Sequence, residues 1–526
     1  MAQQEPEPSF DQYTAELFDF LYTSNGEDVN PVTDALVSET AELIRQAEDQ
    51  NRTGPIVTLF ARLLEIRRQD DIGAGQLGIE RERLEALARR HAEIDEHMVS
   101  VGGRVGQARP IVERANDRVD DYLARKDVEA PSGIELWDRI LNNQERIKKQ
   151  LGMGPEEWNS FSGQIRHAIS SVDELASLID LPARAAADIA RVTKNYRMRL
   201  TPYYTSLIMP GEINDPIMLQ SIPTGEMVDN AGIEIPPVAA DHSPARLVDQ
   251  FYPRVVTIKS TNMCAMYCTH CLRIAHIGKK DKMFSKEAYG EALDYIRANK
   301  RIRDVLITGG DAFVLPNSML KWLLEQLDEI DHVRLKRLGT RVPVTVPMRV
   351  DDELLDILSA SNDKKPVRVV TQINTAREIT PVSKETFKKI SGRVFAVLNQ
   401  AVLLRGINDS RVKMWKLCET IQEAYVRPYY VFNCSYRNPQ FVHFRVPVEK
   451  GRDIIESMYG NIVGDAIPRY IATAGGKIPM HRSNVIGREG NELILKKPWN
   501  GEEVRYPDAD PEIYEGSDFS FARYQD

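Results

Sequence analysis

The chain has 526 residues, 42% of them hydrophobic and 28% charged, and its 68 basic and 77 acidic residues leave a net charge of −9. A chain of this length forms several domains with a sizeable core, and its acidic balance disfavours a general nucleic-acid or membrane-surface binder, because both need a basic surface. No apolar run reaches the roughly 18–20 residues that cross a bilayer, and the polar, acidic start lacks the pattern of a secretory signal, so we expect a soluble, cytoplasmic protein.

The first part of the chain has the pattern of helices. Residues 33–49 and 54–69 carry apolar side chains at helical spacing, and the stretch from Ile79 to about Lys126 is rich in Glu, Arg, Ala and Leu. Candidate breaks in that stretch are Gly102, Gly103 and Pro110. We therefore predict a helical N-terminal extension over residues 1–157, whose charged faces either meet solvent or form an arm that binds a partner.

A helical cap and an extended segment are predicted for residues 158–250. Ser171 and Glu174 have the spacing of a helix capping box. Residues 201–250 are rich in proline and show little periodicity. Apolar side chains in this segment that need burial are Tyr203, Tyr204, Leu207 and Ile208. We expect this segment to wrap over a neighbouring surface.

From about Tyr252 the pattern alternates between strand and helix. The strand candidates are 255–260, 304–309, 334–339, 367–372, 394–399 and 427–432, with helical segments such as 286–299 and 317–330 between them. About six strand–helix units fit, fewer than the eight of a closed barrel. We therefore predict an α/β fold with a partial (β/α)6-type barrel over residues 251–480, followed by a C-terminal tail over 481–526. The active site of such a fold lies at the carboxyl ends of the strands.

Three of the five cysteines stand in one short loop after the first strand. Cys264, Cys268 and Cys271 have a spacing that can hold three irons of a four-iron cluster and leave the fourth iron open to a ligand. A zinc site with His270 as the fourth ligand is the other interpretation, although zinc sites usually draw on two separated pairs of ligands. So few cysteines exclude a disulfide scaffold, and their grouping indicates metal or redox chemistry.

Two turns that contain glycines add weaker signals. The second strand ends in ITGGD (307–311), and glycines at a strand end let the backbone approach a ligand closely. Near the end of the chain Lys477 follows Gly475 and Gly476, and a lysine after such a turn can form a Schiff base with a carbonyl cofactor. Taken alone, the first feature is also typical of an ordinary tight turn and the second of a surface lysine.

The cysteine spacing resembles that of the radical S-adenosylmethionine (SAM) superfamily, in which SAM chelates the open iron and is cleaved to a 5′-deoxyadenosyl radical. From about Trp158 to about Pro507 the sequence also resembles the lysine 2,3-aminomutase family. The matching segments include LTPYYTSLI (200–208), NDPIMLQSIPT (214–224), FYPRV (251–255), CAMYCTHCLR (264–273), ITGGDAF (307–313), RLGTRVPV (337–344), NQAVLLRGIND (399–409), RPYYVFNC (427–434), HFRVPVEKG (443–451) and GGKIP (475–479). Members of that family combine a [4Fe-4S] cluster, SAM and pyridoxal phosphate (PLP).

The resemblance implies roles for individual residues. It implies that the cluster ligands are Cys264, Cys268 and Cys271, and that the SAM pocket includes His270, Gly309, Gly310, Asp311, Arg341 and Gln400. Lys477 resembles the catalytic lysine that holds PLP, while Tyr252 and Arg254 resemble residues at the PLP ring and phosphate. Arg273 matches the arginine that pairs with the substrate α-carboxylate, a task that suits a planar guanidinium.

The side-chain end of the substrate pocket departs from the family pattern. Members of the family that act on lysine bind the distal ammonium of the substrate with two aspartates. At the corresponding positions this chain has Ser435 and Thr473. A buried ammonium without a carboxylate partner is strongly disfavoured, so lysine specificity is in question. Arg437 and Asn438 stand close to Ser435 and suit an acidic or neutral side chain instead. No cysteine follows Cys434, so we predict that the structural zinc site of some members is absent.

These features predict an isomerase that moves the α-amino group of an amino acid, lysine or another, to the β-carbon. The expected partners are that small-molecule substrate, a flavodoxin- or ferredoxin-type electron donor and other copies of the chain, but not nucleic acid or membrane. Two other classes stay open. One is a radical SAM enzyme of the same fold that abstracts hydrogen without aminomutation, and the other is an interaction protein with a relict barrel.

Overall fold

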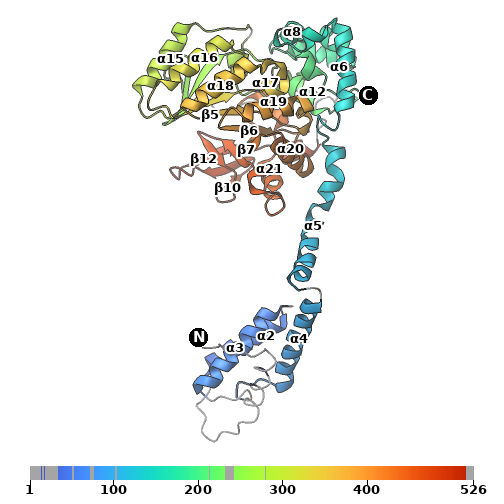
Figure 1. The fold of residues 1–526 in the computed structure, drawn as a ribbon, viewed down its shortest axis with the longest axis vertical. Helices are drawn as coiled ribbons and strands as arrows, with labels where there is room; N and C mark the ends of the chain where they lie inside the picture. Colours follow the sequence, from blue (N-terminus) through green and yellow to red (C-terminus); the bar gives the residue numbers. More distant parts are fainter. Residues whose placement is uncertain are drawn as a thin grey trace, which may run out of the picture. The chain divides into compact units, whose positions relative to one another are not determined.

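The computed structural model describes residues 33–49, 52–70, 76–100, 103–212, 214–230, 242–278 and 280–516, together with Thr14 and Leu17. It divides into two compact units, Met1–Arg118 and Val119–Asp526 (Figure 1). This division falls inside a helix, whereas the sequence pattern suggested boundaries at 157/158, 250/251 and 480/481, which stay predictions. Among the described residues, no helix is both long enough and apolar enough to cross a membrane.

The first unit is helical, as the apolar periodicity predicts. Its helices are α2 (Asp34–Asp49), α3 (Thr53–Asp70), α4 (Arg81–Ser100) and the first part of α5 (Gly103–Glu129). Leu59 and Leu63 of α3 are buried in one apolar cluster with Leu84 of α4, so this unit has a core of its own. Pro110 lies inside α5 and does not end that helix.

The second unit begins with the last turns of α5 and a helical cap. The cap helices are α6 (Trp137–Leu151), α7 (Pro155–Trp158), α8 (Phe161–Arg166), α9 (Val172–Leu178), α10 (Ala183–Val192), α11 (Pro202–Thr205), α12 (Pro216–Ser221) and α13 (Glu226–Asp229). The predicted capping box is confirmed, because the Ser171 side chain accepts from Glu174 N–H and the Glu174 side chain caps in return. Tyr203 and Tyr204 are fully buried, so the segment does pack against a neighbouring surface.

A nine-stranded sheet forms the body of the second unit, with its strands in sequence order (Figure 1). The strands are β1 (Val248–Tyr252), β2 (Val255–Thr261), β3 (Asp304–Gly309), β4 (Leu335–Gly339), β5 (Val367–Thr371), β6 (Ala396–Leu403), β7 (Arg427–Asn433), β8 (Arg469–Thr473) and β9 (Lys477–Pro479). Strands β2 to β8 are parallel, and β1 and β9 pair antiparallel at the two edges. The curled, open sheet confirms the predicted partial barrel.

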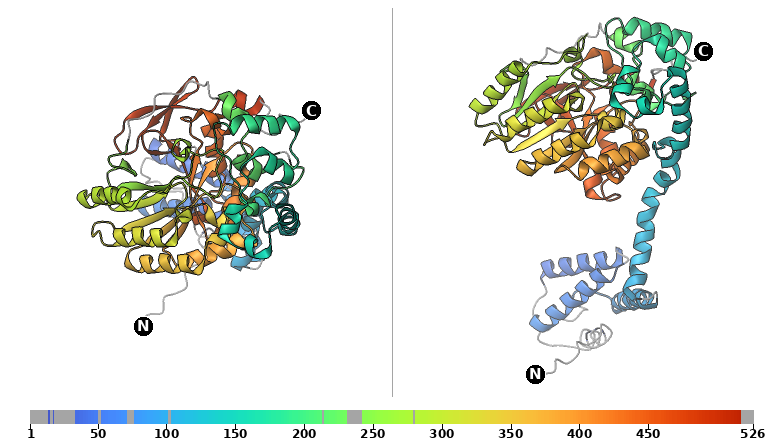
Figure 2. Two further views of the ribbon diagram at one scale, coloured as in Figure 1. Left: turned by 90° about the horizontal axis from the view of Figure 1, so that it is seen from above. Right: turned by 45° about the horizontal axis from the view of Figure 1, so that its top comes forward.

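Crossover helices connect the parallel strands and lie along one face of the sheet (Figures 1 and 2). They are α15 (Lys286–Ala298), α16 (Asn317–Asp328), α18 (Asp352–Lys364), α19 (Pro381–Ser391), α20 (Arg411–Glu423) and α21 (Val448–Glu456). Shorter helices in the connections are α14 (Ile274–Ile277), η2 (Ala312–Val314), α17 (Val342–Thr345), η3 (Pro347–Arg349), η4 (Ala376–Glu378), η5 (Pro439–Phe444) and η6 (Gly464–Ala466). The six predicted strand–helix units are therefore present, and β8 adds a seventh parallel strand that the sequence pattern did not reveal.

Residues 485–507, within the predicted C-terminal tail, form a small antiparallel sheet. Its elements are β10 (Val485–Glu489), β11 (Glu492–Lys496) and β12 (Glu503–Pro507), followed by α22 (Pro511–Gly516). The hydroxyl of Tyr506 on β12 donates to Asn433 Oδ1 at 2.6 Å, and Asn433 in turn donates to the Tyr470 hydroxyl at 2.8 Å. All three residues are buried, so this sheet packs against β7 and β8 and belongs to the core.

Candidate active site

The three clustered cysteines lie in the loop that leaves the carboxyl end of β2. All three carry free thiols. The loop is tied to the cap through its backbone, because Thr269 N–H donates to the Gln220 carbonyl at 3.1 Å and Tyr267 N–H to the Arg199 carbonyl at 3.2 Å. The cap helices therefore position the loop against the mouth of the sheet.

The glycine turn after β3 lies directly against the cysteine loop. Gly310 N–H donates to the Thr261 carbonyl at 2.5 Å, and Asp311 N–H donates to the Met263 carbonyl at 2.8 Å. Gly309 has a φ of +118°, in the region that favours glycine. The two glycines are therefore required for the close approach of these two backbones.

The carboxylate of Asp311 accepts backbone hydrogen bonds from this turn and from the turn after β4. Its Oδ1 accepts from Phe313 N–H at 2.9 Å and its Oδ2 accepts from Arg341 N–H at 2.6 Å. Asp311 is buried, so it fixes the turns after β3 and β4. The predicted contact of Asp311 with SAM is not tested by this geometry.

Arg341, in the turn after β4, connects that turn to the cysteine loop through its side chain. Its Nη1 donates to Cys268 Sγ at 2.8 Å, and its Nη2 donates to Glu378 Oε1 at 2.5 Å and to Gln220 Oε1 at 3.0 Å. Asn374 Nδ2 reaches the same Gln220 oxygen at 3.1 Å. A continuous buried polar network therefore runs from the cysteine loop to the carboxyl end of β5.

His270, between the second and third cysteines, joins the network as a neutral imidazole. Its Nε2 lies 3.3 Å from Asn374 Nδ2. Burial, helped by the positive charge of Arg341, lowers the pKa of His270 to about 3. The structure therefore places His270 beside the residues predicted to bind SAM, in a form that presents one donor and one acceptor nitrogen.

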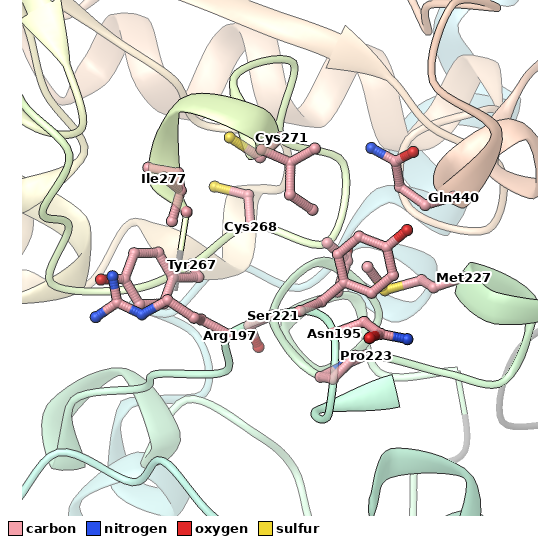
Figure 3. Close-up of a pocket in the computed structure, with 14 residues that line it drawn as sticks. Asn195, Arg197, Ser221, Pro223, Met227, Tyr267, Cys268, Cys271, Ile277 and Gln440 are labelled. Atoms are coloured by element: carbon pink, nitrogen blue, oxygen red, sulfur yellow. The ribbon is translucent and has the colours of Figure 1, made fainter. Parts of the chain in front are cut away.

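A cavity of about 360 Å³ adjoins the cysteine loop. Figure 3 shows Cys268 and Cys271 along one side of it, with Asn195, Pro223 and Met227 of the cap opposite. The cap therefore contributes directly to the surroundings of the cysteines.

The residues around the loop fit an iron–sulfur cluster with a polar ligand beside it. Burial raises the pKa of the Cys264 and Cys271 thiols, that of Cys271 to about 11, and bound iron converts such thiols to thiolates. The amide nitrogen of buried Gln220 has no acceptor within the described part of the chain. A buried donor without an acceptor is costly, so an acceptor atom on a ligand suits this position.

Lys477 stands at the start of β9, paired with the last residue of β8. The glycine turn before it has φ values of +67° and +151°, and the ring of Trp499 packs against the second glycine. The Lys477 ammonium nitrogen lies 4.7 Å from the ring centre of Tyr430 and 5.4 Å from that of Phe432. Burial, reinforced by the charge of Arg337, lowers the pKa of Lys477 to about 8.

Tyr252 lies next to Lys477, although the two residues belong to the opposite edge strands of the sheet. Burial raises the pKa of Tyr252, and the backbone N–H of Lys477 opposes that rise, so the two residues are close neighbours. Arg337 on β4 pairs with Asp304 on β3 at 2.6 Å, and both charges act on Lys477. Arg254 is exposed at the turn after β1, where its carbonyl accepts from the backbone N–H of Asp304 at 3.1 Å.

The remaining predicted residues are more dispersed. Arg273 Nη1 donates to Thr308 Oγ1 at 2.8 Å and to the Gly309 carbonyl at 3.2 Å, so this arginine faces the glycine turn. Gln400 is half-buried at an irregularity in the pairing of β6 with β7. Ser435 is half-buried after β7, and its hydroxyl accepts from Arg437 N–H at 3.2 Å.

Several residues of the site escaped the sequence analysis. Glu378, Gln220 and Asn374 are ordinary polar residues in separate segments, and only the fold unites them around Arg341. Tyr430 and Phe432 stand two positions apart on β7, the spacing that puts two side chains on one face of a strand. This spacing is the sequence feature from which the pair of aromatic rings beside Lys477 could have been predicted.

A partial barrel whose first parallel strand leads into a three-cysteine loop defines the radical SAM class of enzymes. In agreement, residues 258–415 match the model of the radical SAM superfamily. That segment runs from β2 to α20 and contains the three cysteines and the glycine turn.

Similarity to individual proteins identifies one family within the radical SAM superfamily. The chain is 37% identical over 410 residues to a glutamate 2,3-aminomutase of Clostridioides difficile (strain 630), which covers 76% of this chain and 96% of the relative. It is 36% identical over 362 residues to an L-lysine 2,3-aminomutase of Clostridium subterminale, covering 68% and 86%. An L-lysine 2,3-aminomutase of Bacillus subtilis (strain 168) is 34% identical over 383 residues, covering 72% and 80%. This chain belongs to the lysine 2,3-aminomutase family of radical SAM isomerases.

Proposed function

We propose that this chain moves the α-amino group of an amino acid to the β-carbon with the help of a [4Fe-4S] cluster, SAM and PLP. When bound, the cluster and SAM supply a hydrogen-abstracting radical, and PLP supplies an amine-binding aldehyde with a π-system that delocalises an unpaired electron. The observation that carries the PLP assignment is the half-buried Lys477, whose pKa is lowered to about 8. A lysine with a pKa this close to physiological pH has far more neutral amine than an ordinary lysine, which suits covalent attachment of PLP.

The residues around Lys477 have distinct tasks in this proposal. Tyr252, Tyr430 and Phe432 provide flat, largely apolar walls that exclude water from the cofactor. Arg254 stands at the edge of the same region and is proposed to face the PLP phosphate. Arg273, held by Thr308 and the Gly309 carbonyl, offers the rest of its donors to the substrate α-carboxylate.

The substrate is proposed to carry an acidic or neutral side chain. Ser435 and Thr473 occupy the positions where a carboxylate would be needed for a distal ammonium, and neither has a charge. Arg437 is half-buried two residues after Ser435, and its Nε donates to the Tyr436 hydroxyl at 3.3 Å. Its remaining donors suit a carboxylate, and one of the most similar relatives is named for glutamate.

The proposal is tested on anaerobically purified, reconstituted full-length protein. Wild type should bind iron and sulfide, turn brown and cleave SAM on reduction, and the Cys264→Ala, Cys268→Ala and Cys271→Ala variants should not. Cys418→Ala is the matched control, because Cys418 is buried in α20 away from the loop. A PLP absorbance that survives borohydride treatment unchanged, or that persists in Lys477→Ala, contradicts the PLP assignment.

The second candidate is hydrogen abstraction without aminomutation. The changed residues at 435 and 473 favour it, since they alter the part of the pocket that selects the substrate. SAM cleavage that is coupled to loss of a supplied amino acid, but that yields no β-amino isomer, identifies this alternative.

The proposed reductant for either reaction is a small one-electron carrier protein of flavodoxin or ferredoxin type. The chain is also proposed to form homo-oligomers, and light scattering of the purified protein tests this.

A further inference from the structure

A buried ion pair touches one of the three cysteines. The guanidinium of Arg341 bridges Cys268 Sγ, at 2.8 Å, and Glu378 Oε1, at 2.5 Å. Arg341 is 9% exposed and Glu378 is fully buried. Because the pair is buried, water and salt screen its charges much less than they screen a surface pair.

The fold holds both members of the pair in place. The second carboxylate oxygen of Glu378 accepts from Asn374 N–H at 2.8 Å and from Thr375 N–H at 3.3 Å. Tyr204 hydroxyl donates to Glu378 Oε1 at 3.0 Å. The carboxylate is therefore fixed by the backbone of the turn after β5, and it orients the guanidinium toward Cys268.

We infer that Arg341 sets the reduction potential of the iron–sulfur cluster by donating a charge-assisted hydrogen bond to Cys268, and that Glu378 is its positioning residue. This inference rests on the cluster assignment of the proposed function. Reduction adds one electron, supplied by the external reductant, to the cluster. A donor on a ligating sulfur stabilises that added negative charge and raises the potential.

The two members of the pair act in opposite directions. Arg341→Lys keeps a cation opposite Glu378 but lacks the second nitrogen that reaches Cys268, so the potential falls. Glu378→Gln keeps the shape of the side chain and removes the negative charge that offsets Arg341, so the potential rises. A residue with a merely structural role would not produce opposed shifts.

The experiment is a redox titration of the reconstituted full-length protein, followed by the electron paramagnetic resonance of the reduced cluster, without SAM, PLP or substrate. At a fixed solution potential we expect the ratio of reduced to oxidised cluster to fall about tenfold in Arg341→Lys and to rise in Glu378→Gln. A tenfold change equals about 59 mV for a one-electron couple. Arg349→Lys is the control, since Arg349 is 5% exposed and donates to the Leu315 carbonyl and Asn317 Oδ1.

The other outcomes overturn the inference. Unchanged potentials in both variants would show that Arg341 does not set the potential, and shifts of the same sign in both variants would indicate a structural effect. If Arg341→Lys assembles no cluster, the potential of Glu378→Gln decides, because an unchanged or lowered value contradicts the inference. A wild-type protein that assembles no cluster contradicts the proposed function itself, so the two failures are distinguishable.

Discussion

Gly310 and Met263 are in backbone contact, and a Cβ atom added to Gly310 would fall 2.1 Å from the Met263 carbonyl oxygen. This contact fastens the turn after β3 to the cysteine loop after β2. Because the obstructing atoms belong to the backbone, no side-chain movement can relieve the clash. The geometry of the three cysteines therefore depends on a glycine in a neighbouring segment.

Gly310→Ala should displace the cysteine loop and reduce cluster assembly to a small fraction of wild type. We expect a loss of stability of about 1–3 kcal/mol as well, in the range for overpacked sites. Bound iron and sulfide per chain, together with thermal unfolding, measure both effects.

Gly290→Ala supplies the matched control. Gly290 lies within α15, and a Cβ there meets no atom within 4 Å. Replacing a helical glycine with alanine should stabilise the protein by up to about 1 kcal/mol and leave cluster content unchanged. Full cluster content in Gly310→Ala would contradict the account of the contact.

Attachment of PLP to Lys477 should depend on pH around the lowered pKa of about 8. The neutral amine is the nucleophile, so the attachment rate should rise roughly tenfold per pH unit below pH 8 and level off above it. An ordinary lysine, with a pKa near 10.4, would still show a rising rate at pH 9. Stopped-flow absorbance with apoprotein and PLP records the profile.

Arg337→Gln should move that profile to higher pH, because the Arg337 charge contributes to the lowered pKa. Loss of the arginine also leaves the negative charge of Asp304, which favours the protonated lysine. Arg334→Gln serves as the control, since Arg334 is exposed at the start of the same strand region. Identical midpoints for wild type and Arg337→Gln would rule out this electrostatic role.

The partial barrel could be predicted from the sequence because most of its strands are short apolar runs that stand out from the segments around them. Val305 and Ile307 of β3 are apolar and fully buried, and Gly309 and Gly310 follow at the strand end. Strand β8, which is as long as β4 and β5, was not predicted because it begins and ends with the exposed residues Arg469 and Thr473. Its assignment depends on pairing with β7, which is a tertiary property.

Tyr252→Phe should weaken the junction between the two edge strands. The substitution removes the hydroxyl whose pKa the Lys477 backbone N–H lowers, and it should cost at most about 1.5 kcal/mol, the upper range for one hydrogen bond. We expect faster loss of PLP on dilution, measured by absorbance of the released cofactor.

Tyr203→Phe is the control, because it loses a hydrogen bond in the cap, where the Tyr203 hydroxyl pairs with Thr380 Oγ1 at 2.7 Å. It should destabilise the protein to a similar extent without accelerating PLP release. Equal release rates for the two variants would show that the Tyr252 hydroxyl does not support the Lys477 site.

Carboxylates at positions 435 and 473 should shift substrate preference toward lysine. The Ser435→Asp, Thr473→Asp double variant supplies carboxylate partners for a distal ammonium. We expect the ratio of kcat/KM for lysine over glutamate to rise at least tenfold, measured by mass spectrometry of the β-isomers. The Ser435→Asn, Thr473→Asn variant is the uncharged control and should not change this ratio.

The polar part of the site was less predictable than the cysteines. The three cysteines lie within eight residues of one another, so the sequence alone predicts that they are close in space. Arg341 and Gln220 are 121 positions apart, and only packing of the cap on the barrel brings them together. Glu378 is likewise placed by the turn after β5, whose capping interactions are local but whose position beside Arg341 is not.

The most direct test of the central claim is anaerobic incubation of the reduced, reconstituted protein with SAM, PLP and each common amino acid, followed by mass spectrometry for β-amino products. The account predicts a β-isomer from an amino acid with an acidic or neutral side chain, and loss of that product in Lys477→Ala. SAM cleavage without any β-isomer would contradict the proposed aminomutase, and efficient conversion of lysine alone would contradict the specificity argued from Ser435 and Thr473.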